Sequence, residues 1–329
     1  MKYRGKHIQQ VKLISIMNVT KQDLINCHNR IKPHIHKTPV LTSRLINELA
    51  DTEIYFKCEN FQRMGAFKMR GATNAILQLS ENKKAKGVVT HSSGNFAQAL
   101  SLAAQTLGVK AYIVMPENAP QVKKNAVKGY DGEIIECKST IEAREKTAME
   151  IQQKTGATFL HPSNDLNVII GQGTAAKELL EEFSDLDYIF TPVGGGGLVA
   201  GTIIAAQHLN KNCKVIGAEP KAVDDAYRSL KSGKIEKNNS TNTIADGLKT
   251  HLGDINFPII RSGIKEIILV EEAEIKSAMK LIWERMKIVV EPSSAVPLAA
   301  LLKGKSRFNN QKVGIILSGG NVDLENLVF

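Results

Sequence analysis

Lys68 is the residue whose type and setting are best suited to covalent chemistry. It lies in residues 60–76, NFQRMGAFKMRGATNAI, between a glycine turn and an expected helix start. Its neighbours Phe67 and Met69 provide a partly apolar setting, which would lower the pKa of the amine and make its neutral, nucleophilic form accessible. The common alternative is a solvated lysine at a helix start. Its position between a glycine turn and an expected helix start makes Lys68 a candidate to form a Schiff base.

A run of four glycines predicts a binding site for one phosphate. It follows an expected strand at 187–193 and precedes an expected helix at 198–209. Such a turn leaves backbone N–H groups free at the positive end of a helix dipole. A tight turn without a ligand is the alternative, and the spacing does not fit the G-x-G-x-x-G pattern of dinucleotide sites. The four residues are Gly194, Gly195, Gly196 and Gly197.

A second polar turn, SSGN, is suited to holding a carboxylate. It lies between an expected strand at 87–91 and an expected helix at 96–108. Its hydroxyl and amide groups and the helix dipole favour an anion there. An ordinary helix N-cap is the alternative. The turn consists of Ser92, Ser93, Gly94 and Asn95.

Short β-branched runs alternate with helical patterns, which indicates an α/β fold with parallel sheets. Expected strands at 87–91, 111–116, 133–137 and 158–162, with helices between them, form a small unit over residues 80–164. A second alternation follows, ending with a helix at 271–287 and a strand at 312–320. We therefore expect a large domain, residues 1–79 and 165–329, into which the small domain is inserted.

The composition of the chain excludes several classes of protein and of binding site. The chain has 329 residues, 43% of them hydrophobic, which favours a large core split into two lobes. The net charge of +10 comes from scattered lysines with little aromatic interleaving, so we expect no nucleic-acid partner. Four separated cysteines without a C-x-x-C pattern predict neither disulfides nor a zinc site.

The N-terminal residues faintly imitate a signal peptide. Basic residues precede VKLISIMNV, but this stretch is short, contains Lys12 and lacks a small-residue cleavage site. No run has the length needed to span a membrane. We therefore expect a cytoplasmic protein without a membrane partner.

Nine motifs in order resemble one enzyme family. They are AFKMRG around Lys68, SSGN, GQGT (171–174), GGGG, AEP followed by DD (218–225), TIADGL (243–248), WERMK (283–287), EPSSA (291–295) and SGGNVD (318–323). The pattern resembles the fold type II pyridoxal-phosphate (PLP) enzymes, in the branch of serine racemases and serine/threonine dehydratases, and covers nearly the whole chain. The fold implied is two-domain and tryptophan synthase β-like.

The resemblance implies roles for the motif residues toward PLP. Lys68 would carry the cofactor, the glycine run would hold its phosphate, and Ser318 would meet the pyridine nitrogen. A serine there leaves the ring a weaker electron sink than an acid would, which favours prompt loss of a β-leaving group. The implied cofactor-binding residues are Phe67, Lys68, Asn95, Gly194, Gly195, Gly196, Gly197, Glu291 and Ser318.

The resemblance also implies a substrate site for an amino acid. The SSGN turn would grip the α-carboxylate, and Ser93 would face the side of the cofactor opposite Lys68, as racemisation requires. Phe96 departs from the histidine found in many members, and Arg144 would lie near the pocket, where it could receive a β-carboxylate. A solvated helix arginine is the alternative for Arg144.

Two further sites and an assembly follow from the resemblance alone. Glu219, the carbonyl of Val223 and Asp225 match a site for a divalent cation such as Mg²⁺ or Ca²⁺, or Mn²⁺; surface acids are the alternative. Gln98, Arg285, Lys287 and Asn321 fall at positions resembling an ATP effector site. A homodimer is expected.

We therefore expect an ammonia-lyase that converts L-threonine or L-serine to a 2-oxo acid and ammonia by α-proton abstraction and β-elimination. Serine racemisation and elimination from 3-hydroxyaspartate are the alternatives within the family, and β-replacement is less favoured. From other classes, an NAD oxidoreductase would bind NAD and be colourless, and an amino-acid sensor would bind ligand without turnover.

Overall fold

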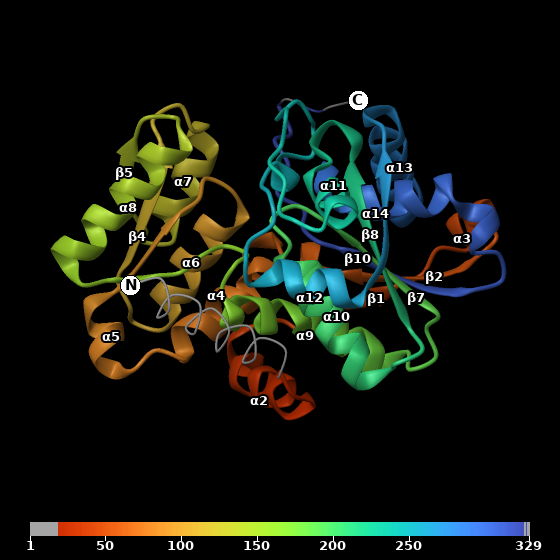
Figure 1. Cartoon of the computed structure of the whole chain (residues 1–329), viewed down its shortest axis with the longest axis horizontal. Helices are drawn as coiled ribbons and strands as arrows, with labels where there is room; N and C mark the ends of the chain where they lie inside the picture. Colours follow the sequence, from red (N-terminus) through yellow and green to blue (C-terminus); the bar gives the residue numbers. More distant parts are fainter. Residues whose placement is uncertain (1–18, 326, 328–329) are drawn as a thin grey trace.

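The computed structural model describes residues 19–325 and residue 327, so the signal-like N-terminal stretch, apart from its last residue Val19, lies outside the described residues. Two separate sheets, each flanked by helices, form two lobes (Figure 1). The α/β two-domain fold predicted from the alternating pattern is confirmed.

The large domain is built on a six-stranded sheet in the order β1-β2-β10-β7-β8-β9. All neighbours are parallel except β1, which pairs antiparallel with β2. β10 thus lies between β2 and β7, strands from distant parts of the chain. The strands are β1 Val40–Leu41, β2 Glu53–Cys58, β7 Tyr188–Pro192, β8 Lys214–Pro220, β9 Ile264–Val270 and β10 Lys312–Leu317.

Helices cover both faces of this sheet, and two hydrophobic cores result. One face packs α2 (Lys21–Ile31), α9 (Leu166–Glu182), α10 (Gly197–Leu209) and α12 (Asn256–Gly263). The other face packs α3, α13 and α14. Because both faces are covered, the sequences of the strands are nearly continuous runs of apolar residues. The remaining helices of this domain are α3 Arg44–Ala50, α4 Lys68–Leu77, α11 Asp225–Ser232, α13 Glu272–Met286 and α14 Pro292–Lys303.

The small domain contains a parallel four-stranded sheet in the order β5-β4-β3-β6. Its last strand ends at Phe159, earlier than expected, because the His161 ring accepts from the next backbone N–H groups and starts a turn. The domain boundaries at 79/80 and 164/165 stay a prediction. The elements are α5 Glu81–Lys86, β3 Val88–His91, α6 Asn95–Thr106, β4 Ala111–Pro116, α7 Gln121–Gly129, β5 Glu133–Cys137, α8 Ile141–Thr155 and β6 Thr158–Phe159.

Capping side chains explain where helices α8 and α9 begin. The Asp165 side chain accepts from the Val168 N–H and caps the N-terminus of α9. Thr140 caps α8 in the same way through the Ala143 N–H. No helix in the described part of the chain has the length and apolar character needed to cross a bilayer.

Candidate active site

Lys68 is the first residue of α4, at the junction of the two domains. Its Nζ donates to the carbonyl of Pro162, 2.8 Å away, in the segment that returns from the small domain. The rings of Phe67 and Phe96 have centroids 5.0 and 5.8 Å from Nζ. Burial lowers the Lys68 pKa to about 8, against an opposing influence from the Glu291 carboxylate. A neutral, nucleophilic amine is therefore accessible near neutral pH.

Backbone bonds join the lysine turn to the loop after β10. Phe67 N–H donates to the Ser318 carbonyl at 3.0 Å, and Gly320 N–H donates to the Gly65 carbonyl at 2.9 Å. Gly65 has a φ of 79°, a conformation that glycine adopts without strain. Ser318 is buried, and its hydroxyl lies 3.1 Å from that of Ser294. These bonds place Ser318 next to the turn that carries Lys68, and its role toward a cofactor stays a prediction.

Asn95, the first residue of α6, connects the small domain to the large one. Its amide donates to the Glu291 carboxylate at 3.0 and 3.1 Å. Its amide oxygen accepts from Asn321, 2.9 Å away. Burial, with a further contribution from Asp246, raises the Glu291 pKa to about 7, whereas the Asn95 bond opposes the shift. Glu291 is therefore close to its protonation midpoint at neutral pH.

The glycine run has the properties of a phosphate cup. Among the described residues, none of the N–H groups of residues 194–197 donates a hydrogen bond to the protein. Gly196 has a φ of 83°, and a Cβ on Gly194 would lie 2.8 Å from the Leu248 Cα, so side chains are excluded. Free amides at the start of α10 provide what a phosphate dianion requires.

Two hydroxyl groups next to this cup were missed from the sequence. A Cβ on Gly195 would lie 2.4 Å from Ser163 Oγ and 3.0 Å from Thr250 Oγ1. Asn256 fixes this arrangement by donating to the carbonyls of Ser163 and Gly195, at 3.0 and 2.8 Å. No local motif marks these residues, because they meet Gly195 only through the fold.

The SSGN turn lies between β3 and α6, as predicted. Ser92, Ser93 and Gly94 are half-buried, and a Cβ on Gly94 would meet no atom within 4 Å, so the turn borders open space. The turn is at the carboxyl end of β3, the edge where α/β sheets bind ligands. The roles of Ser92, Ser93 and Gly94 toward a substrate stay predictions.

Arg144 lies on α8 near the same sheet edge. Its charge acts on the pKa values of His91, at the end of β3, and Cys137, at the end of β5; burial is the larger cause of both shifts. The Arg144 Nε atom is buried and has no hydrogen-bond partner among the described residues. A buried donor without a partner costs free energy, so a bound acceptor would be favoured. The role of Arg144 toward a substrate stays a prediction.

The predicted metal residues lie together at the end of β8. Glu219 and Asp225 are fully buried, and Val223 lies between them in a 3-10 turn. Burial, together with Asp225, raises the Glu219 pKa well above its ordinary range. Glu219 accepts from the N–H groups of Ala226 and Tyr227 at the start of α11, whereas Asp225 Oδ1 has no partner in the described structure. The raised pKa of Glu219 and the unpartnered oxygen of Asp225 are both consistent with a site for a cation.

Two carboxylates alone would not complete a metal site. In the described ranges, no group of three or more His, Cys, Asp or Glu side chains could hold an ion. Main-chain carbonyls such as that of Val223 would have to supply ligands, as hard cations permit. The cation stays a prediction.

The four positions that resemble an ATP site are dispersed over three elements. Gln98 is buried in α6, Arg285 and Lys287 are exposed at the end of α13, and Asn321 follows β10. Asn321 donates to Asn95 and to the Met64 carbonyl. An effector role for these residues stays a prediction.

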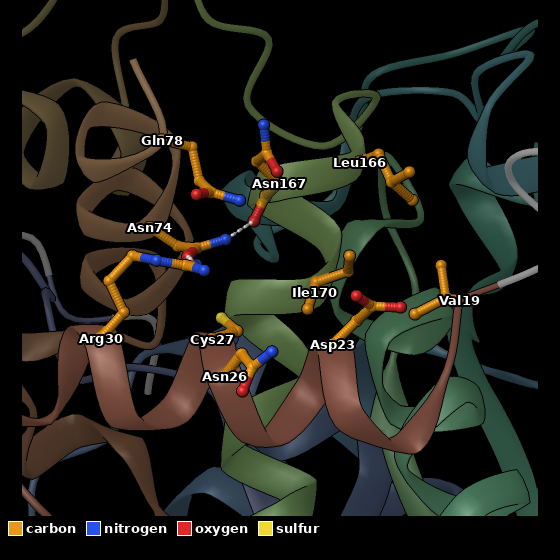
Figure 2. A pocket seen from close by; sticks show the side chains of 10 residues that line it. All are labelled: Val19, Asp23, Asn26, Cys27, Arg30, Asn74, Gln78, Leu166, Asn167 and Ile170. Atoms are coloured by element: carbon orange, nitrogen blue, oxygen red, sulfur yellow. Dashed lines mark hydrogen bonds between the residues drawn. The ribbon is translucent and has the colours of Figure 1, made fainter. Parts of the chain in front are cut away.

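A separate pocket of about 430 Å³ lies between α2, α4 and α9 (Figure 2). Its lining includes Asp23, Arg30 and Asn74, and the Asn74 amide donates to the Asn167 carbonyl at 2.7 Å. None of the predicted site residues lines it. The chemistry of the motifs therefore belongs to the junction of the domains and not to this pocket.

Comparisons with known proteins agree with this geometry. A family model described as pyridoxal-phosphate dependent enzyme matches residues 31–319. A serine racemase of Dictyostelium discoideum is 56% identical over 94% of this chain and 97% of its own, and a beta-hydroxyaspartate dehydratase of Paracoccus denitrificans is 49% identical over 94% and 98%. A crystal structure of the Dictyostelium discoideum serine racemase superposes with a TM-score of 0.89, covering 93% of this chain and 99% of that one.

The residues present fit this cofactor. The free amides of the glycine run suit its phosphate, and Lys68 has the depressed pKa that imine formation with an aldehyde needs. The relatives named above support the serine racemase and hydroxyaspartate alternatives better than threonine as substrate. The chain belongs to the fold type II PLP enzymes of the serine racemase and serine/threonine dehydratase family.

Proposed function

We propose that this protein removes the α-proton of L-serine, and that the reaction then divides between racemisation to D-serine and elimination to pyruvate and ammonia. The setting of Lys68 carries the proposal. This amine has a pKa of about 8 and lies in the turn that Ser318 fixes. The similarity to a serine racemase over nearly the whole chain supports serine as the substrate.

Different side chains of the protein would remove and return protons in this reaction. Bound PLP supplies an electron sink that acidifies the substrate's α-C–H bond. Neutral Lys68 takes that proton on one face. For racemisation, Ser93 returns a proton on the opposite face. For elimination, protonated Lys68 would give its proton to the β-hydroxyl, which would depart as water, and the released enamine would tautomerise and hydrolyse to pyruvate and ammonia.

The test separates the two outcomes in one enzyme. Ser93→Ala should suppress D-serine formation and action on D-serine, while much of the pyruvate formation from L-serine remains, because Lys68 alone serves the L face. Chiral chromatography and an oxo-acid assay measure the two products. Ser139→Ala, at an exposed serine of the same domain, is the matched control. Equal loss of both activities in Ser93→Ala would refute the two-face model.

We propose 3-hydroxyaspartate as a second substrate for elimination. The unpartnered Nε of Arg144, close to the end of β3, supports this. A guanidinium binds a carboxylate through two parallel hydrogen bonds, and serine and threonine offer no second carboxylate. The similarity to a beta-hydroxyaspartate dehydratase is consistent with this substrate.

Arg144→Gln distinguishes the substrates. The variant should lose about 1.5–3 kcal/mol of transition-state stabilisation for L-threo-3-hydroxyaspartate, the scale of a charged hydrogen bond, and far less for L-serine or L-threonine. The measurement is kcat/KM for all three substrates. Lys146→Gln, two residues along α8 and exposed, is the control. A uniform loss across the three substrates would make Arg144 structural.

A further inference from the structure

Two charged side chains meet across the domains, away from the contacts around Lys68. Lys123 extends from α7 of the small domain, and its Nζ forms an ion pair with Asp246 of the large domain. Asp246 begins a short turn, η5 (Asp246–Leu248). Both side chains are partly open to solvent, with exposures of 28% and 47%.

Lys123 and Asp246 each lie in an element that is anchored within its own domain. On the small-domain side, Lys124 anchors α7 by donating to the Glu117 carbonyl and the Glu136 carboxylate, at 2.8 and 2.7 Å. On the large-domain side, Gly247 N–H donates to Ser293 Oγ at 3.1 Å. Domain separation would draw these two anchored elements apart and thereby break the Lys123–Asp246 pair.

The pair also lies next to the cofactor-binding elements. Leu248 of η5 is buried and blocks any side chain at Gly194 of the phosphate cup. Asp246 and Lys123 both act on the Glu291 carboxyl, where they raise and lower its pKa respectively, although burial is the main cause of its shift. Glu291 in turn holds Asn95 of the small domain.

We propose that the Lys123–Asp246 pair is a latch that holds the small domain closed over the active site. Some other cross-domain bonds, such as Asn95 to Glu291, involve cofactor-site residues and would be rearranged by ligands, whereas others, such as Arg63 to Thr106, do not. The latch involves neither the cofactor nor the motif lysine. It therefore biases the balance between open and closed forms without direct contact with the reacting groups.

Because both side chains are partly exposed to solvent, the ion pair is weak enough to break and re-form. Solvent-exposed ion pairs contribute up to about 1 kcal/mol, about a fivefold change in an equilibrium at 1.36 kcal/mol per factor of ten. Such a pair biases the domains toward closure without trapping substrate or product. Salt should weaken it, because screening at ionic strengths well above 0.1 M shortens the reach of exposed charges.

The experiment uses the holoenzyme and measures access to the bound cofactor directly. Acrylamide, a neutral quencher, is added to wild type, Lys123→Gln, Asp246→Asn and the charge swap K123D/D246K, and quenching of cofactor fluorescence is recorded. KM is measured in parallel. The quenching needs only bound cofactor, so it is valid whichever substrate the enzyme prefers. Lys110→Gln is the matched control, since Lys110 forms an exposed ion pair with Glu133 inside the small domain.

Each single variant should raise the quenching constant and KM two- to fivefold, because both follow the fraction of open enzyme. The charge swap should restore both to near wild type, and Lys110→Gln should change neither. A swap as impaired as the single variants would overturn the latch. So would an equal effect of Lys110→Gln, which would show that net charge and not closure was responsible.

Discussion

At the residue scale, the site depends on groups whose protonation is shifted by burial. Lys68 and Glu291 have pKa values of about 8 and 7, moved toward each other from 10.5 and 4.5. Groups that titrate near neutral pH are typical of sites that move protons. Motifs predicted both residues, but not the Glu291–Asn95 bond that connects them to the small domain.

The rate of cofactor uptake by the apoenzyme should follow the neutral form of Lys68. We expect this rate to rise with pH and reach half its maximum near pH 8, because only the unprotonated amine attacks an aldehyde. Glu291→Gln should move the midpoint lower, because the carboxylate raises the Lys68 pKa. Stopped-flow absorbance between pH 6.5 and 9.5 measures it. A midpoint near 10 in wild type would contradict the depressed pKa.

At the element scale, a buried ion network positions the helix that begins with Lys68. Arg70, two residues further along α4, binds Glu59 and Glu178 at 2.7 and 2.8 Å, and Lys57 binds Glu178 at 2.7 Å. All four side chains are almost completely buried. Although burial alone would raise the Glu178 pKa, hydrogen bonds from His28 and Arg70 hold it well below its ordinary value. The start of α4 is thereby fixed to β2 and α9.

Arg70→Met should destabilise the fold by about 3–5 kcal/mol, because it leaves two buried carboxylates without their main partner. Urea unfolding followed by circular dichroism measures this. Arg44→Met removes an exposed arginine paired with Glu48 and should cost less than about 1 kcal/mol. Similar losses in the two variants would show that burial adds nothing to the network.

The acidic pair after β8 predicts a stability that depends on pH and on divalent cations. In the folded chain the Asp225 pKa rises from 3.8 to about 7, chiefly through burial. The metal-free fold therefore binds more protons than the unfolded chain, and its stability falls as pH rises from about 4 to 7. A bound cation would remove this loss by neutralising both carboxylates.

Melting temperatures measured in chelator should fall between pH 5 and 8, and Mg²⁺, Ca²⁺ or Mn²⁺ should restore them at pH 8. Asp225→Asn should abolish the cation effect and flatten the pH dependence. Asp224→Asn, at the half-exposed neighbour that pairs with Arg228, serves as the control. Identical melting curves for wild type with chelator and with cation would argue against a metal site.

At the scale of the whole molecule, sequence patterns predicted most of the fold but few of its long-range contacts. Elements such as β4 and α8 could be predicted because each carries its own apolar run or cap. α14 was missed, since it is apolar all round and contains Pro297. Ser163 and the Lys123–Asp246 pair were missed because their partners are distant along the chain.

The assembly of two chains stays a prediction from resemblance. Phe61 and Val289 are 44% and 46% exposed, and their segments are joined by the Asn60 amide, which donates to the Val289 carbonyl. Exposed apolar side chains near each other are typical of subunit interfaces. Light scattering should give twice the mass of one chain for wild type and a single-chain mass for the variant Val289→Asp.

Because β10 lies in the middle of the large sheet, this sheet can be completed only late in synthesis on the ribosome. The small domain's sheet uses only strands between residues 88 and 159, so it can form while synthesis continues. The large sheet stays divided until residues 312–317 emerge and join β2 to β7. The Phe67–Ser318 and Gly65–Gly320 bonds around the lysine turn can form only after residues 318–320 have also emerged. A nascent chain stalled before residue 312 should consequently carry a folded small domain and yet retain no cofactor.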